Sequence, residues 1–262
     1  MPLELYQIDS FTAKIFHGNP ACVVPLKEWL PDEVLLKITR ENAVAETAFF
    51  IDKGDSIHLR WFTPEIEMDL CGHATLAAAH CLVSILNYKK DTIVFDTKSG
   101  ALTVEVKDGM YYMDFPSRMP EVSTLPDLIA KSLNIQPKAV FKSRDYVLVY
   151  DSEEEIKKIQ IERSIFDLIN LDPGGVVVTS VGSDCDFVSR YFTPQSTILE
   201  DPVTGSAHCS LIPFWSSKLG KETLFARQIS ERGGELYCQN KEKRVIVAGK
   251  ARTYAKAQIY ID

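Results

Sequence analysis

One pattern occurs twice in this chain, and the second copy follows about half a chain length after the first. The first copy reads Arg-Trp-Phe-Thr-Pro over 60–64 and the second reads Arg-Tyr-Phe-Thr-Pro over 190–194, so the two lie 130 residues apart. The tripeptide Ala-His-Cys follows each of them, over 79–81 and over 207–209. This period is too long for a solenoid repeat. It predicts two halves that share one structural plan and arose by duplication.

Both copies predict the same local structure. The residues up to Phe62 alternate polar and apolar side chains around β-formers, as a half-buried strand does, and the following proline ends that strand. A glycine-containing turn and a helix follow. The helix expected over 74–86 is rich in alanine and apolar on nearly every face, which indicates burial all round. The second helix, expected over 206–219, contains Pro213, which should kink it.

The fold class that follows is α+β. We expect two pseudo-symmetric halves, each a curved and mostly antiparallel sheet wrapped around a central buried helix. The proline-rich segment 116–126 is the weakest join. We therefore divide the chain into an N-terminal half, 1–118, and a C-terminal half, 119–262, with the last strand at about 251–262 as a candidate to pack back onto the N-terminal half. Peripheral helices are expected over 32–42, 125–133, 153–159 and 163–171.

Composition excludes several classes of partner. The formal net charge of the 262 residues is −7, so the chain lacks the cationic surface that nucleic acid or an anionic membrane demands. No apolar run reaches the ~20 residues that cross a bilayer. The first residues carry Glu4 and Asp9 instead of a basic start followed by an apolar core, so no signal peptide is expected. The sequence favours a cytoplasmic protein that binds neither nucleic acid nor membrane.

The two glycine turns suggest a way to hold an anion. The first N–H groups of a helix have no partner within the helix and lie at its positive end, so they stabilise a negative ligand without lysine or arginine. Gly72 and Gly205 each lie at such a start, and one small carboxylate could meet both. The alternative is that these glycines only permit tight turns.

Glu46 is the second candidate for chemistry, because it is the only charged residue within 43–50. If that segment is buried, its low polarity disfavours the charged carboxylate and suits the side chain to general acid–base work. The alternative is a glutamate that faces solvent at the start of a strand. Other catalytic signatures are absent from the sequence, including phosphate-binding loops, the nucleophile elbow and the zincin motif. We expect no metal site, because the neighbouring His80 and Cys81 diverge around a helix.

Together, the motifs resemble those of the PhzF-like (phenazine biosynthesis) isomerase family, within the diaminopimelate-epimerase-like superfamily. The resemblance covers nearly the whole chain in family order. The residues that carry it are His17-Gly18-Asn19-Pro20-Ala21, Ala45-Glu46-Thr47, the first repeat motif, Cys71-Gly72-His73-Ala74-Thr75, Asp201-Pro202-Val203-Thr204-Gly205-Ser206-Ala207 and Ser230-Glu231-Arg232-Gly233-Gly234-Glu235-Leu236.

This resemblance implies a cofactor-free isomerase that moves a proton within a small carboxylic acid bound between the two halves. It implies that Glu46 is the proton shuttle and that His73 and Asp201 assist the proton transfer. It further implies that Gly72, Gly205, Ser206 and Asn19 hold the substrate, and that the protein is a homodimer.

One departure keeps alternatives open. The epimerases and racemases of this superfamily use a cysteine at each of two equivalent turns, whereas this chain has Cys71 at the first turn and Asp201 at the 130-residue equivalent. An epimerase or racemase that uses Cys71 and Asp201 is therefore the runner-up. A protein that binds a carboxylate on the same fold without catalysis is the third reading. The sequence does not identify the substrate.

Overall fold

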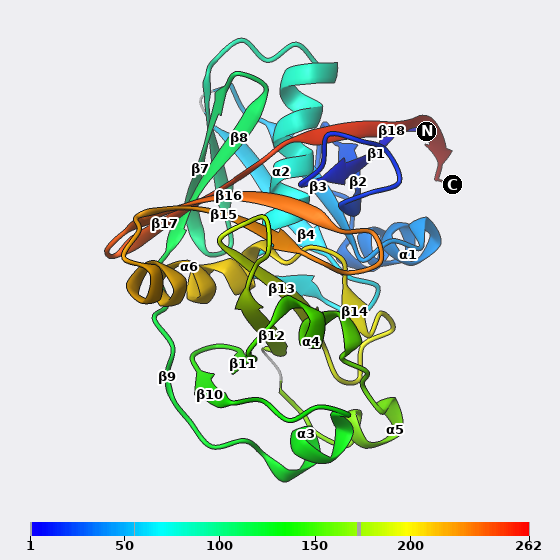
Figure 1. Ribbon diagram of the computed structural model, residues 1–262. Coiled ribbons are helices and arrows are strands. Elements are labelled where there is room, and N and C mark those ends of the chain that lie inside the picture. The colour runs from blue at the N-terminus through cyan, green and yellow to red at the C-terminus, as the bar shows by residue number, and fades with distance from the viewer. Residues whose placement is uncertain (1, 55, 172–173, 262) are drawn as a thin grey trace. The chain divides into compact units, whose positions relative to one another are not determined.

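The computed structural model describes residues 2–54, 56–171 and 174–261 (Figure 1). The chain forms two units: the first comprises Met1–Phe115 together with Ala248–Asp262, and the second comprises Pro116–Val247. The C-terminal strand belongs to the first unit, where β18 (Ala251–Tyr260) pairs antiparallel with β1 (Pro2–Ser10). Each unit is considered in turn.

The first unit holds a run of strands that continues from β1. Its remaining elements are β2 (Asn19–Pro25), α1 (Asp32–Asn42), β3 (Glu46–Asp52), β4 (Ile57–Phe62), β5 (Glu67–Met68), α2 (Gly72–His80), a π-helical turn η1 (Cys81–Ile85), β6 (Thr92–Thr97), β7 (Gly100–Lys107) and β8 (Met110–Pro116). Strand β1 pairs antiparallel with β2, β2 parallel with β3, β3 antiparallel with β4, β4 parallel with β6, and β6 antiparallel with β7.

The second unit repeats that ladder. Its elements are β9 (Glu121–Val122), α3 (Asp127–Ser132), β10 (Ala139–Lys142), β11 (Tyr146–Val149), α4 (Glu153–Lys158), α5 (Arg163–Phe166), β12 (Val176–Val181), β13 (Phe187–Phe192), β14 (Glu200–Asp201), α6 (Gly205–Leu219), β15 (Thr223–Gln228), β16 (Gly234–Lys241) and β17 (Arg244–Gly249). Strands β10 to β13, then β15 and β16, pair in the same antiparallel and parallel order as β1 to β4, then β6 and β7. The expected α+β class is confirmed.

Helix α2 is enclosed by the first unit. Every residue from Gly72 to His80 is buried, and the helix packs against β1, β2, β3 and β18. Burial on all sides is what its alanine-rich sequence requires, because such a helix has no polar face to offer to water. The α-helical hydrogen bonding stops at His80, and the π-helical turn Cys81–Ile85 replaces the last part of the helix expected over 74–86.

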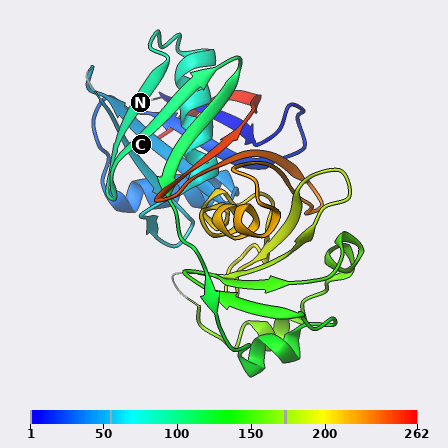
Figure 2. The same cartoon turned by 60° about the vertical axis from the view of Figure 1, so that its left-hand side comes forward.

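Helix α6 has the same place in the second unit, following β13 and β14 as α2 follows β4 and β5. It contacts β15 and β16, and Figure 2 views it nearly end-on. Eleven of its fifteen residues are buried, and it continues through Pro213 to Leu219. Gly220 then ends the helix in the left-handed conformation (φ 65°), which glycine adopts without steric cost.

The repeated motif ties a short strand to the front of each helix. Arg60 donates two hydrogen bonds to Glu67 of β5, at 2.8 and 2.9 Å. Arg190 does the same to Glu200 of β14, at 2.7 and 2.8 Å. Each guanidinium also lies over the phenylalanine two residues later, as Arg60 does over Phe62 at 4.9 Å. These bidentate pairs explain why arginine and phenylalanine recur at this spacing.

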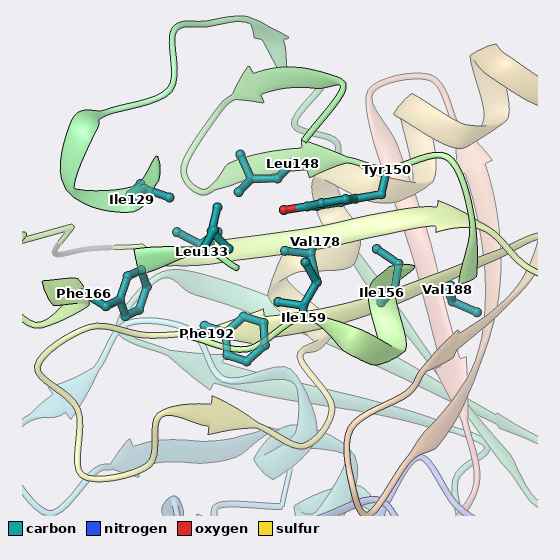
Figure 3. Packing of buried hydrophobic residues seen from close by; sticks show 11 residues of the cluster. Ile129, Leu133, Leu148, Tyr150, Ile156, Ile159, Phe166, Val178, Val188 and Phe192 are labelled. Carbon is teal, nitrogen blue, oxygen red and sulfur yellow. The ribbon is translucent and has the colours of Figure 1, made fainter. Parts of the chain in front are cut away.

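The second unit has a hydrophobic core beside β11 to β13. Helices α3 to α5 contribute Ile129, Ile156 and Phe166 to it, and the strands contribute Leu148 and Val178 among others (Figure 3). Within the described residues, no helix combines the length and the apolar character that a membrane crossing requires.

Two buried histidines predict how stability depends on pH. Burial lowers the pKa of His80 from 6.5 to about 4, with Arg252 adding to the effect, and burial lowers that of His208 to about 4 as well. In the unfolded chain both rings take up protons below pH ~6.5. The folded state should therefore lose stability as the pH falls from about 6.5 towards 4, by roughly 1.4 kcal/mol per pH unit for each histidine.

Urea unfolding between pH 4.5 and 7.5 measures this dependence. His80 lies between the Tyr111 hydroxyl at 3.0 Å and the Thr253 hydroxyl at 2.9 Å, and glutamine can replace both contacts without titrating. His80→Gln should make the fall in stability on acidification less steep, while the contribution of His208 remains. An unchanged slope in this variant would contradict the assignment.

Candidate functional site

Glu46, Cys71 and His73 form a compact group in the first unit. Glu46 is the first residue of β3 and lies opposite Ala21 of the parallel strand β2. Cys71 is the residue before α2, and His73 is the second residue of that helix. One ligating atom from each of the three side chains lies within 4.8 Å of the other two. The sequence places Glu46 in one motif and Cys71 and His73 in another, and the packing of α2 against β3 brings the three together.

The imidazole of His73 lies between the other two groups. Its Nε2 is 3.0 Å from Glu46 Oε2, and its Nδ1 is 3.7 Å from Cys71 Sγ. His73 is only 4% exposed, while the Glu46 side chain is 16% exposed. The Nε2–Oε2 pair has the distance of an ion pair without the alignment of a hydrogen bond, and neither atom has an aligned partner among the described residues. A ligand beside this pair could therefore hydrogen-bond with either atom.

Charge decides the protonation of this group. Burial raises the pKa of the Cys71 thiol, although His73 beside it lowers that pKa, and the sulfur is a neutral thiol at neutral pH. Burial lowers the pKa of His73, but the negative charge of the Glu46 carboxylate and the contact of Nδ1 with the Cys71 sulfur outweigh burial and raise that pKa above its usual value. We therefore assign an imidazolium at His73 that faces the Glu46 carboxylate.

The loop before β2 supports the start of α2. The Ser10 hydroxyl donates to the His73 carbonyl at 2.8 Å, and Ser10 pairs across the β1–β2 ladder with Asn19, which is fully buried. Gly18 makes this approach possible. Its φ is +68°, and a Cβ at this position would lie 2.1 Å from the Ser10 carbonyl oxygen. The glycine of the His-Gly-Asn-Pro-Ala motif is therefore a steric requirement.

Both helix starts leave their backbone donors without a side-chain cap. Cys71 precedes α2 and Thr204 precedes α6, and neither side chain makes a cap hydrogen bond. Neither helix carries an acidic residue in its first turn. The first-turn N–H groups and the positive end of each helix dipole therefore suit a carboxylate ligand.

Asp201, Thr204 and Gln228 form a second group, in the second unit. The Thr204 hydroxyl donates to Asp201 Oδ2 at 2.5 Å. Gln228 is 1% exposed. Its Nε2 donates to the Asp201 carbonyl at 2.7 Å and to the Thr204 hydroxyl at 3.2 Å, and its Oε1 accepts from the Thr204 N–H at 2.9 Å. The side chain of Gln228 thus fixes the turn from which α6 begins.

The starts of α2 and α6 show that the residue pairing inferred from the 130-residue spacing is wrong at these turns. Spacing by 130 pairs Cys71 with Asp201, but in the structure the residue before each helix is Cys71 in one unit and Thr204 in the other. In both cases the side chain of the fourth residue after this position donates a hydrogen bond to its backbone carbonyl. The Thr75 hydroxyl donates to the Cys71 carbonyl at 2.6 Å, and His208 Nδ1 donates to the Thr204 carbonyl at 2.8 Å. Thr204 is therefore the structural counterpart of Cys71.

The site residues predicted from the sequence are divided between the two units. Glu46, Gly72, His73 and Asn19 belong to the first unit, and Asp201, Gly205 and Ser206 belong to the second. Sequence reasoning missed Ser10 and Gln228, which lie far along the chain from the residues they hold. A lone polar residue at the end of a strand was the only signal for either of them. The sequence did show Cys71 and His73 close together, but it did not place Glu46 beside them as a third side chain able to ligate a metal.

Comparisons with known proteins identify the family and the fold. A family model described as phenazine biosynthesis-like protein matches residues 8–257. An uncharacterized isomerase from Pseudomonas aeruginosa is 44% identical, with all of both chains covered. A crystal structure of a PhzF-family protein from Enterococcus faecalis has a TM-score of 0.94 and 44% identity over all of both chains. A predicted epimerase from Pseudomonas aeruginosa has the same fold at 21% identity, with a TM-score of 0.76 over 99% of this chain and all of the other.

The steric role of Gly18 is testable. Gly18→Ala should destabilise the protein by more than the ~1 kcal/mol that a positive φ alone costs an alanine, because its Cβ meets the Ser10 carbonyl. Gly109→Ala is the matched control, since Gly109 has φ +73° and open space around it. Urea unfolding compares the two variants. Equal losses of stability would show that the contact with Ser10 does not matter.

A second prediction concerns Gln228. Gln228→Leu should leave the Thr204 N–H and the Asp201 carbonyl without their partner and cost about 1–3 kcal/mol of stability. It should also lower activity, because the turn that positions Asp201 loosens. The exposed Gln258→Leu is the control. Unchanged thermal unfolding of Gln228→Leu would overturn this role.

Proposed function

The chain belongs to the phenazine biosynthesis-like family and is an isomerase, and on that premise we propose that it moves a proton within a small carboxylic acid without a cofactor. Glu46 is the acid and base in this proposal. The observation that carries it is the Glu46 carboxylate 3.0 Å from the imidazole of His73, beside a buried helix start whose N–H groups lack a side-chain cap. A protein that only binds a carboxylate needs the helix start but no such pair.

The chemistry follows from the charges. The carboxylate of Glu46 removes a proton from a carbon of the substrate, and the electron pair of that C–H bond delocalises towards the substrate carboxylate. The backbone donors at the start of α2 stabilise the negative charge as it grows. Where the delocalised system of the substrate includes a carbon–carbon double bond, Glu46 then returns the proton to a different carbon of that system, and the double bond shifts position, which completes the isomerisation. The imidazolium of His73 balances the negative charge that develops on the substrate.

The residues of the second unit have supporting roles in the proposal. Gly205 and Ser206 begin α6, whose uncapped N–H groups suit an anionic or carbonyl oxygen. The carboxylate of Asp201 assists proton transfer, and Gln228 and Thr204 hold it in place. Asn19 contributes a buried amide beside Ser10.

The epimerase alternative has less support. A two-base epimerase needs a nucleophilic base at each of the two helix starts, but the counterpart of Cys71 is Thr204, whose hydroxyl donates to Asp201. Burial also keeps the Cys71 sulfur protonated by raising its pKa. These two observations favour Glu46 as the base.

Deuterium exchange tests the proposal. The wild-type protein is incubated in D₂O with a panel of small amino, keto and unsaturated carboxylic acids, and NMR follows the carbon-bound hydrogens. Glu46→Gln should lower the exchange rate of the active compound by about 10²–10⁴-fold, because the variant lacks a base. Glu41→Gln, an exposed glutamate on α1, is the control and should exchange normally.

Two outcomes would redirect the assignment. Exchange that persists in Glu46→Gln and disappears in Cys71→Ser would favour the epimerase that uses Cys71 and Asp201. Clear binding of a panel acid with no exchange in the wild-type protein would favour the non-catalytic binding protein.

A further inference from the structure

The site of the proposed reaction also contains a thiol that the reaction does not use. Cys71 Sγ lies 3.7 Å from His73 Nδ1, and one ligating atom each of Glu46, Cys71 and His73 lies within 4.8 Å of the other two. Proton transfer by Glu46 beside an imidazolium needs no sulfur. The presence of all three donors at one place therefore calls for a separate explanation.

We propose that Glu46, Cys71 and His73 bind one Zn²⁺ ion, and that this ion inhibits the enzyme by occupying its acid–base pair. The inhibition rests on the proposed function, whereas the metal site does not. The donor set is one sulfur, one imidazole nitrogen and one carboxylate oxygen. This mixture suits Zn²⁺ and does not suit Mg²⁺ or Ca²⁺, which prefer oxygen ligands alone.

The distances fit such an ion. Zinc bonds of ~2.3 Å to sulfur and ~2.0–2.1 Å to nitrogen place these two atoms about 3.6 Å apart in tetrahedral geometry. The observed separation of Cys71 Sγ and His73 Nδ1 is 3.7 Å. A zinc-bound oxygen and nitrogen lie about 3.3 Å apart in the same geometry, so the Glu46 carboxylate, which lies 3.0 Å from Nε2, has to turn towards the Nδ1 side of the ring to reach the ion.

The surroundings hold two of the three ligands in place. The Thr75 hydroxyl donates to the Cys71 carbonyl, and the Ser10 hydroxyl donates to the His73 carbonyl. Glu46 keeps a partly exposed side chain and can rotate.

Three protein ligands leave the fourth position of a tetrahedral zinc open to water or to the carboxylate of a substrate. Binding is nevertheless inhibitory, because Glu46 and His73 then bind the metal and no longer take part in proton transfer. The ion displaces the thiol proton of Cys71 and one proton of the His73 imidazolium, so its uptake releases two protons to the solvent.

Cobalt spectroscopy tests the site without any substrate. Co²⁺ replaces Zn²⁺ in such sites, and a thiolate ligand gives it a charge-transfer band in the near ultraviolet. We expect the wild-type protein to develop this band with one Co²⁺ per chain and to lose it when Zn²⁺ is added. Cys71→Ser should abolish the band and weaken Co²⁺ binding at least tenfold. Glu46→Gln should keep the band and also weaken binding at least tenfold.

Cys185→Ser is the matched control, because Cys185 is half-buried whereas the other five cysteines are buried. It should retain the full cobalt band. A band that persists in Cys71→Ser, a band that disappears in Cys185→Ser, or no band at millimolar Co²⁺ would each overturn the site.

Inhibition is measured separately, by deuterium exchange in the wild-type protein. Zn²⁺ should slow the exchange at least tenfold, and EDTA should restore it. Normal exchange at zinc concentrations that saturate the cobalt-competition signal would overturn the inhibitory role. If the wild-type protein exchanges no acid on the panel, the proposed reaction fails while the cobalt spectrum still decides the metal site.

Discussion

The first unit depends on burying a helix that has no polar face. Helix α2 is rich in alanine and all of its residues are buried, and β1, β2, β3 and β18 cover it. The same burial sets up the chemistry. A helix end inside protein has backbone donors that water cannot satisfy, and here no side chain caps them. An anionic substrate is one of the few groups that can pair with them there.

Burial also determines the strength of the interaction between Glu46 and His73. In water, an ion pair between a glutamate and a histidine contributes little. Around His73 the low polarity strengthens the attraction, and the Glu46 carboxylate raises the pKa of the imidazole against the effect of burial. The proposed function uses these two neighbouring side chains as a base and an acid. The neutral thiol of Cys71 gives the same pocket a donor for a soft metal ion.

Local pattern predicted much of the fold. The helix expected over 32–42 is α1 with the same bounds, because its charged face and its flanking signals are local. The helix expected over 74–86 begins two residues earlier and changes to a π-helical turn at Cys81, a change that the run of apolar residues does not signal. Spacing also paired Cys71 with Asp201, whereas the backbone pairs it with Thr204, since the loop before α6 is three residues longer. Ser10 and Gln228 escaped notice because tertiary contacts alone define their roles.

The Arg60–Glu67 and Arg190–Glu200 pairs have a consequence for how such a protein can change. They fix the approach to each helix through side chains that lie outside the helix start, whereas the proposed binding of an anion there uses main-chain N–H groups. The residues at the two starts, Cys-Gly-His and Thr-Gly-Ser, are thereby released from the task of holding the fold together. A substitution at one start can alter the reaction while the other copy and both arginine pairs stay as they are. Duplication of this scaffold thus provides a second binding end on which new chemistry can evolve without loss of the old.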